Sequence, residues 1–333
     1  MKKRLYIFLI LLSVVTNISF AQFPPPAGQE GSTAIHKDSA VFIDWASDCI
    51  VERGYLDISQ PELGFVDFGT VDDALAQADN SVVSLGDGGV ATVTFAVPVA
   101  NGYGFDFAVF ENGFSDTFLE LAFVEVSSDG ENFFRFNSVS LTQTDVQVEG
   151  FGELNTEKIN NLAGKYRVEY GTPFDLEELA NEPGLDVNHI THVRIIDVTG
   201  CIQDDYATFD SQGNKINDPW STPFPSGGFD LDAVGVIHNT ENMMIDGNVM
   251  TEIRVFPNPV PTNTDVIQVI FPIEVHLFKY SINSLDGVVI KSDNQLDVPV
   301  NRLMINTTLL KHGLYILKIE TGNGMIIKKI VKN

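Results

Sequence analysis

The chain has 333 residues and a formal net charge of −25, with 20 Lys and Arg against 45 Asp and Glu. Nucleic acids and anionic lipids are bound through clusters of Lys and Arg, so this balance argues against a nucleic-acid partner. The two cysteines are far apart and form no CxxC motif, which excludes a zinc site built from cysteine alone.

The N-terminus has the parts of a secretory signal peptide. A basic segment at residues 2–4 precedes the almost wholly apolar residues 5–15, and Ser19-Phe20-Ala21 forms a small-x-small cleavage site. The apolar run is about half as long as a membrane-spanning helix needs to be. We therefore expect residues 1–21 to be removed and the mature protein to be exported without spanning a membrane.

The acidity is confined to one part of the chain. Residues 22–252 hold 8 Lys and Arg against 39 Asp and Glu, a net charge of −31, whereas residues 253–333 hold 9 against 6, a net charge of +3. Residues 239–252 are polar and contain an Asp-Gly turn. This pattern predicts a passenger domain at 22–238, a linker at 239–252 and a C-terminal domain at 253–333.

The passenger domain has the sequence pattern of β-structure almost throughout. Short apolar runs alternate with turn residues, as in strands joined by tight turns. An Asp before Leu-Glu-Glu-Leu predicts one short helix within residues 174–180. Because the strands follow one another without a βαβ rhythm, we expect an all-β, jelly-roll-like β-sandwich. The expected strands are residues 90–97, 104–110, 119–127, 132–137, 192–198 and 229–238.

Five segments carry a resemblance to known proteins: residues 82–89, 105–114, 120–130, 163–165 and 226–236. Together they resemble a family of bacterial cell-surface proteins of unassigned activity. The Val-Ser-Ser-Asp-Gly hairpin at residues 126–130 is also similar to the discoidin-like jelly rolls, whose members bind glycans, lipids or proteins through loops at one end. Neither resemblance supplies a catalytic motif, so what they imply is a surface-binding fold.

Cys49 and Cys201 both lie in polar, loop-like contexts. An oxidising compartment permits one disulfide, and closing a loop of this length contributes about 4 to 5 kcal/mol in the chain-entropy model. We expect a disulfide between them, with two unpaired buried thiols as the alternative.

Residues 204–218 offer many oxygen ligands, with four Asp, two Asn and a Gly that permits a tight turn. Calcium takes six to eight oxygen ligands from flexible loops, and it is the one cofactor that this composition favours. The spacing departs from the EF-hand loop, and Asp and Asn also stabilise turns without metal, so both interpretations stay open. The candidate calcium ligands, including two from the last strand of the passenger domain, are Asp204, Asp205, Asp210, Asn214, Asp218, Asp230 and Asp232.

Candidate ligand-binding residues come from polar contexts at the ends of strands and in loops. Aromatic rings there can stack on sugars, or can instead cap the core of the sandwich. These candidates are Trp45, Tyr206, Trp220, Glu111 and Asn112.

Two other interpretations remain open. A polysaccharide hydrolase needs two carboxyl groups about 5 to 9 Å apart, for which Glu111, Glu120, Asp230 and Asp232 are candidates. The sequence contains no GxSxG, Walker A or GxGxxG motif, so no enzyme signature supports this interpretation. The third interpretation is a structural surface component without a small ligand.

Three signals follow one another at the C-terminus. Residues 255–259 read Val-Phe-Pro-Asn-Pro, residues 312–319 begin His-Gly-Leu-Tyr, and residues 326–333 form a basic and apolar last strand. In this order, residues 254–333 resemble the type A C-terminal sorting domain of the type IX secretion system of Bacteroidota. The resemblance implies a small Ig-like β-sandwich that is recognised by the secretion machinery. It also implies passage through the periplasm and release or display outside the cell.

These features predict a secreted or surface-displayed binding or adhesion module. We expect an extracellular glycan or another surface ligand as its partner, and the composition of the domain is compatible with calcium as a stabilising ion.

Overall fold

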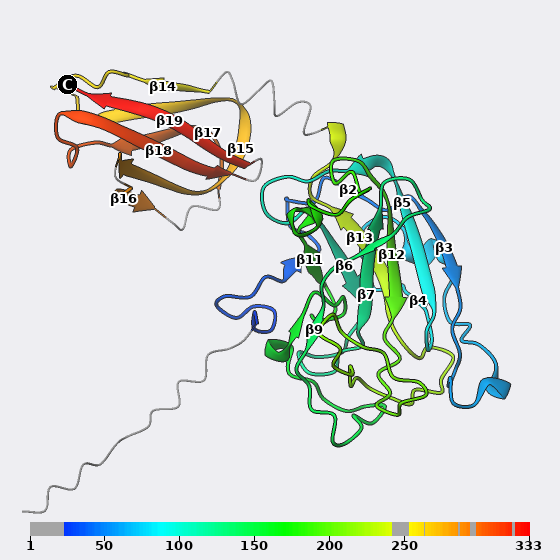
Figure 1. The fold of residues 1–333 in the computed structure, drawn as a ribbon. Coiled ribbons are helices and arrows are strands. Elements are labelled where there is room, and N and C mark those ends of the chain that lie inside the picture. Colours follow the sequence, from blue (N-terminus) through cyan, green and yellow to red (C-terminus); the bar gives the residue numbers. More distant parts are fainter. Residues whose placement is uncertain (1–22, 242–252, 263, 286, 294–297, 322–323) are drawn as a thin grey trace, which may run out of the picture.

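The computed structural model describes residues 23–241, 253–262, 264–285, 287–293, 298–321 and 324–333. The predicted signal peptide and residues 242–252 of the predicted linker lie outside the described residues. Figure 1 shows two bodies built of strands, the passenger domain and a smaller C-terminal domain. Within the described ranges, no helix is both long enough and apolar enough to cross a membrane.

Two large antiparallel sheets form the sandwich of the passenger domain. The first has the strand order β1-β11-β6-β13-β2, with β4 beside β13, and the second has the order β3-β5-β12-β7-β8. This arrangement confirms the predicted all-β sandwich. The first sheet consists of β1 (Ile35–His36), β2 (Asp44–Trp45), β4 (Val83–Ser84), β6 (Phe107–Glu111), β11 (Tyr170–Phe174) and β13 (Asp230–Val236). The second consists of β3 (Asp48–Glu52), β5 (Val90–Val99), β7 (Ala122–Ser127), β8 (Phe134–Arg135) and β12 (Ile190–Asp197).

Apolar side chains from both sheets form the main core of the passenger domain. Strands β6 and β13 are buried along their whole length, which explains why residues 107–110 and 233–236 show no alternation of apolar and polar side chains. The rings of Phe107, Phe136 and Phe174 contact one another in this core, with centroids 5.0 to 6.0 Å apart. Full burial of each such ring stabilises the fold by about 1.5 to 3 kcal/mol.

The helical parts of the passenger domain are single 3₁₀ turns. The predicted short helix is present as η4 (Leu176–Leu179), where the side chain of Asp175 accepts a hydrogen bond from the N–H of Glu177. The other 3₁₀ turns among the described residues are η1 (Pro61–Leu63), η2 (Val71–Ala74) and η3 (Thr156–Lys158).

The long connections of the passenger domain gather at one end of the sandwich, which we call the loop end. Strand β6 ends there at Glu111, next to the start of β13, and β12 ends there at Asp197, next to the start of β7. The connections β6–β7 and β12–β13 therefore both cross between the sheets at this end. The connection after β8, with the short pair β9 (Val139–Ser140) and β10 (Ile159–Asn160), contributes to a second apolar cluster there. Figure 1 shows these loops below β7 and β9.

The predicted disulfide is not formed in the structure, where Cys49 and Cys201 are both free and buried. Cys49 lies on β3 opposite Val93 and packs in the main core between the sheets. Cys201 follows β12 in the connection to β13, outside that cluster. The two thiols belong to different parts of the domain, which sequence separation alone could not reveal.

The C-terminal domain is built around one long strand. The first half of β15 (Val266–Ser284) pairs with β14 (Arg254–Phe256) and β17 (Val298–Asn306), and its second half pairs with β16 (Val289–Asp293) and β18 (Gly313–Thr321). The last strand, β19 (Gly324–Lys332), pairs with β18. The apolar cluster of the C-terminal domain contains only residues of that domain, so the two domains have separate cores.

Candidate functional site

Buried carboxyl groups are concentrated at the loop end of the passenger domain. Glu111 and Asp197 end strands there, Asp230 begins one, and three more carboxyl groups lie in the adjoining segments. Carboxyl side chains are seldom buried unless they are paired or hydrogen-bonded. The six buried carboxyl groups of this set are Asp87, Glu111, Glu120, Asp197, Asp218 and Asp230.

Backbone amides of the loops are the main partners of these carboxyl groups. The oxygens of Asp197 accept hydrogen bonds from the N–H groups of Phe229 and Gly88, at 2.8 and 2.9 Å. One oxygen of Asp87 accepts from the N–H of Ile58 at 2.8 Å and from the indole Nε1 of Trp220 at 3.0 Å. Buried loop amides have no strand neighbour to bond, so the carboxyl groups satisfy them and hold the loops in place.

Burial also changes the acidity of these groups. It raises the pKa of Asp197 to about 8, and it raises those of Asp87 and Asp230 to about 6. Burial, reinforced by the neighbouring carboxyl groups, raises the pKa of Glu111 and of Glu120 well above the usual range. These carboxyl groups therefore keep their protons to a higher pH than exposed carboxyl groups do.

Glu111 differs from the other members of the set. Its Oε2 accepts a hydrogen bond from the N–H of Gly113 at 2.7 Å, whereas its buried Oε1 has no hydrogen-bond partner within the described residues. The predicted ligand contact Asn112 lies beside it and is half-buried. Glu111 itself is 1% exposed, so the structure places it beneath the surface.

The predicted calcium ligands do not come together in the structure. Asp210 accepts hydrogen bonds from the backbone N–H groups of Ser140, Gln212 and Asn214. The exposed Asp204 pairs with Lys215 at 2.6 Å, and Asp205 is exposed beside it. Of the residues that the structure describes, no three His, Cys, Asp or Glu side chains form a group that could hold a metal ion. This geometry supports turn-making by Asp210.

The remaining members of the predicted calcium set are buried apart from this turn. Asp232 accepts hydrogen bonds from the N–H groups of Asp79 and Asn80. Asp218 accepts from the N–H of Leu121, and Asp230 accepts from the hydroxyl of Ser84. Each of them thus has a structural hydrogen bond of its own.

The aromatic residues that were predicted to bind a ligand are less exposed than their sequence contexts suggest. Trp45 packs against Phe42 and Phe110, with centroid distances of 5.0 and 5.4 Å. Trp220 is half-buried with its Nε1 bonded to Asp87, and Tyr206 is half-buried as well. For Trp45 and Trp220, these positions are those expected of rings that cap a core.

A different set of aromatic side chains is exposed at the loop end. Phe114 stacks on Phe118 at 5.2 Å, Phe118 stacks on Phe151 at 6.1 Å, and Phe151 contacts Phe224 at 5.8 Å. Phe114 is 75% exposed and Phe151 is 72% exposed. We call Phe114, Phe118, Phe151 and Phe224 the aromatic row. A continuous apolar surface of this kind on a secreted protein is typical of an interaction site.

Hydrogen bonds between the loops fix the aromatic row. The N–H of Leu154 donates to the carbonyl oxygen of Thr117 at 2.7 Å, which joins the loops of Phe151 and Phe118. The N–H of Trp220 donates to the carbonyl oxygen of Val148 at 3.0 Å, which joins the loops of Phe224 and Phe151. The row is therefore carried by loops that are bonded to one another and, beneath them, to the buried carboxyl groups.

Sequence patterns gave only a weak signal for this row. Each of its members stands in a segment rich in Gly, Ser or Pro, where a strand is not expected, namely residues 112–118, 148–153 and 219–228. Large apolar residues in such segments can plug a core or face solvent, and only the structure distinguishes these outcomes. The structural role of Asp87 and Asp197 was also not apparent from the sequence.

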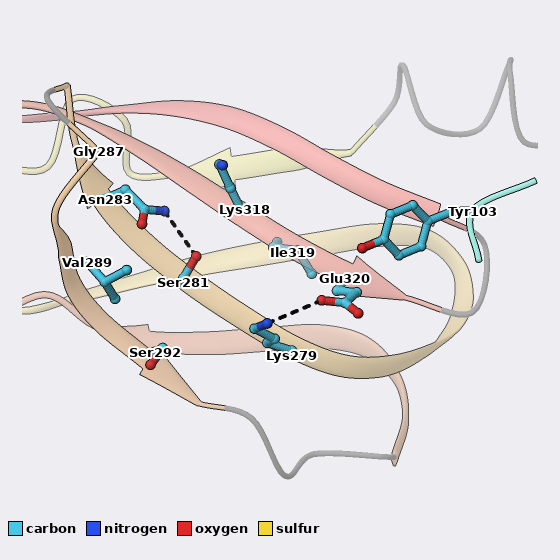
Figure 2. Close-up of a pocket in the computed structure, with 10 residues that line it drawn as sticks. All are labelled: Tyr103, Lys279, Ser281, Asn283, Gly287, Val289, Ser292, Lys318, Ile319 and Glu320. Carbon is cyan, nitrogen blue, oxygen red and sulfur yellow. Dashed lines mark hydrogen bonds and ion pairs between the residues drawn. The ribbon is translucent and has the colours of Figure 1, made fainter. Parts of the chain in front are cut away.

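The C-terminal domain contains a separate cavity of about 520 Å³. Figure 2 shows it over strands β15, β16 and β18, with Lys279, Ser281 and Lys318 among its lining residues. Tyr103 of the passenger domain also lines it. None of the residues predicted as catalytic, metal-binding or ligand-binding lies in this cavity.

Residues 254–333 match the family described as the secretion system C-terminal sorting domain. This match confirms the resemblance for that segment, which we call the sorting domain from here on. It shows that the protein is exported by type IX secretion to the cell surface or beyond it. No curated protein matches the sequence of the chain.

Solved structures that align with the chain include the BSP domain of a biofilm-associated protein, at 9% identity and a TM-score of 0.21, over 73% of this chain and 48% of that one. Another is PorZ of Porphyromonas gingivalis, described as an essential surface component of the type IX secretion system, at 9% identity and a TM-score of 0.22, over 81% and 40%. A third is a β-glucuronidase of Faecalibacterium prausnitzii, at 12% identity and a TM-score of 0.20, over 87% and 45%. The chain spans less than half the length of each, and likeness at these scores carries no conclusion about activity.

Proposed function

We propose that the passenger domain is a binding or adhesion module, which the sorting domain at residues 254–333 brings to the outside of the cell. The observation that carries this proposal is the aromatic row. Its two most exposed rings, Phe114 and Phe151, expose most of their surface on loops that are hydrogen-bonded to one another. A rigid apolar surface loses little conformational entropy when it binds a ligand.

The charges around the aromatic row favour a neutral ligand. Asp67, Glu149 and Glu153 are exposed near it, and residues 112–118, 148–153 and 219–228 contain no Lys, Arg or His. The side chain of Arg167 reaches the first of these segments, where an ion pair with Asp116 neutralises its charge. The N–H of Phe68 bonds to the carbonyl oxygen of Pro225, which brings Asp67 close to Phe224. An anionic ligand would be repelled, so we propose a neutral glycan whose C–H faces pack on the rings.

The hydrolase interpretation gains no support from the carboxyl groups on which it depends. Glu111, Asp230 and Asp232 are 1%, 6% and 1% exposed. Neither Glu111 nor Asp230 lines the cavity of Figure 2. A substrate would have to reach them through the packed loop end.

Calcium binding at residues 204–218 stays a prediction. Binding would have to replace the backbone N–H groups that now donate to Asp210, or use oxygens that face solvent. A ligand that binds only the folded state raises the melting temperature, so a calcium titration of the full chain tests the site. A melting temperature that stays constant at millimolar calcium would reject it.

A glycan array with the full chain tests the proposed ligand class. We expect binding to neutral glycans, and we expect Phe114→Ala with Phe151→Ala to abolish it. Ile50→Ala is the matched control, because Ile50 is 67% exposed on β3, where it forms no part of the aromatic row. Binding to no glycan by the unchanged chain would favour the structural surface component instead.

A further inference from the structure

Three lysines lie on one face of the sorting domain, on three neighbouring strands. In the β15–β18 pairing Lys279 is opposite Glu320 and Ser281 is opposite Lys318. In the β18–β19 pairing Ile327 is opposite Lys318 and Lys329 is opposite Ile316. Residues opposite one another, and residues two positions apart on a strand, share a face of the sheet.

Lys279, Lys318 and Lys329 therefore form a diagonal line across this face, which we call the lysine line. All three are exposed. Glu320 faces the same side and forms an ion pair with Lys279 at 3.7 Å. Such a pair between exposed groups is weak and would exchange readily for another anion.

Two members of the lysine line, Lys279 and Lys318, line the cavity of the sorting domain, and so does Glu320, whereas Lys329 lies outside the lining. Figure 2 shows Lys279 and Lys318 lining the cavity, together with the hydroxyl groups of Ser281 and Ser292 and the amide of Asn283. Asn283 donates a hydrogen bond to Ser281 at 3.0 Å, which orients both groups at the cavity wall. The volume of about 520 Å³ is in the range of small-ligand sites.

We propose that the cavity and the lysine line bind an anionic saccharide, meaning a sugar chain that carries carboxylate groups. The ammonium groups would bind the carboxylates, and the hydroxyl and amide groups would bind the sugar hydroxyls. An acidic peptide fits less well, because an added strand needs the backbone groups of a sheet edge, and this site is made of side chains on a sheet face. This site is independent of the aromatic row.

The charge of the two domains assigns this ligand to the sorting domain. Residues 22–252 carry 39 Asp and Glu against 8 Lys and Arg, whereas residues 253–333 carry 6 against 9. An anionic sugar chain is repelled by the passenger domain and attracted by the lysine line. The two domains would therefore bind saccharides of different charge.

Binding of polygalacturonate to the full chain, measured by isothermal titration calorimetry, tests this proposal. We expect binding that weakens with added salt, and about tenfold weaker binding when Lys279, Lys318 and Lys329 are all changed to Ala, since each exposed ionic contact contributes modestly. Lys311→Ala is the control for each single lysine change, because it removes one positive charge from an exposed position outside the cavity, and it should leave the affinity unchanged.

Two further polymers make the result specific. Dextran, which is neutral, and polyglutamate, which carries carboxylates on a polypeptide, should bind much more weakly than polygalacturonate. Equal binding of polyglutamate, an equal loss with Lys311→Ala, or no binding of polygalacturonate would each overturn the proposal. Phe114→Ala with Phe151→Ala should leave polygalacturonate binding intact, so failure at the aromatic row and failure here are distinguishable.

Discussion

The side-chain Oδ2 of Asp218 accepts a hydrogen bond from the backbone N–H of Leu121 at 2.6 Å. This bond joins the β12–β13 connection to the residue just before β7, across 97 positions of sequence. Both residues are buried. At the loop end, carboxyl groups thus replace the backbone partners that a strand would have supplied to the loop amides.

Asp218→Ala should lower the free energy of unfolding by about 1 to 3 kcal/mol, because it leaves the buried N–H of Leu121 without a partner. Burial, with Asp197 nearby, raises the pKa of Asp218 well above its usual range, because the charged form is disfavoured at this buried position. Asp218→Asn keeps a neutral acceptor and should cost much less. Urea denaturation compares the two variants, and equal losses would contradict this role.

Stability should fall as the pH rises from mildly acidic to alkaline values. The pKa is about 6 for Asp87 and Asp230 and about 8 for Asp197 in the folded chain, compared with about 3.9 for an unfolded Asp. The folded chain therefore holds more protons between these values. The stabilisation is fully present below about pH 4 and is lost as the pH rises through about 6 and then about 8.

Melting temperatures measured from about pH 5 to about pH 9 test this dependence. Asp230→Asn should flatten the part of the profile near pH 6, because the amide can still accept the hydrogen bond from Ser84 but does not titrate. A melting temperature that rises steadily over this range would contradict the raised pKa values.

Thiol counting tests the cysteines. Burial raises the pKa of the Cys49 thiol to about 12, and it also raises the pKa of Cys201. Neither thiol should react with Ellman's reagent in the folded protein, and both should react after unfolding without a reductant. No reactive thiol in the unfolded, unreduced protein would establish the disulfide that the structure lacks.

Glu125 should be the most sensitive position on the outer face of the second sheet. Its carboxylate pairs with Arg135 at 2.8 Å and also with Arg194, and these residues stand side by side on β8, β7 and β12. Glu125→Ala should cost about 1 to 3 kcal/mol of unfolding free energy, because it leaves two guanidinium groups without their shared acceptor. Arg135→Ala should cost less, since Arg135 is 40% exposed and Arg194 keeps its partner.

Local patterns in the sequence predicted most of the sandwich. Strands β5, β7, β12 and β13 lie within two or three residues of their predicted bounds, because long apolar runs with turn residues at their ends restrict where a strand can lie. The five-residue strands β3 and β11 were not predicted, and neither were the short strands β1, β2 and β4. The two residues of each short strand pair only with distant strands, so no local pattern marks them.

The candidate site could be predicted only in part. Asp210 and Asp218 were predicted as candidate calcium ligands. Whether a carboxyl group binds a metal or a distant backbone amide depends on contacts with residues such as Ser140 and Leu121, which the sequence does not show. The aromatic row could not be predicted for the same reason, because its members come from three loops that are far apart in the sequence. By contrast, the sorting domain is one continuous segment, which is why its sequence alone identifies it.

The central claim is that the aromatic row is the ligand-binding surface of the passenger domain. The most direct measurement is the affinity of the full chain, and of its Phe114→Ala, Phe151→Ala double variant, for the neutral glycan that binds best on the array. We predict that the double variant loses binding while its melting temperature stays near that of the unchanged chain, because both rings are mostly exposed. Unchanged affinity in a folded double variant would contradict the claim.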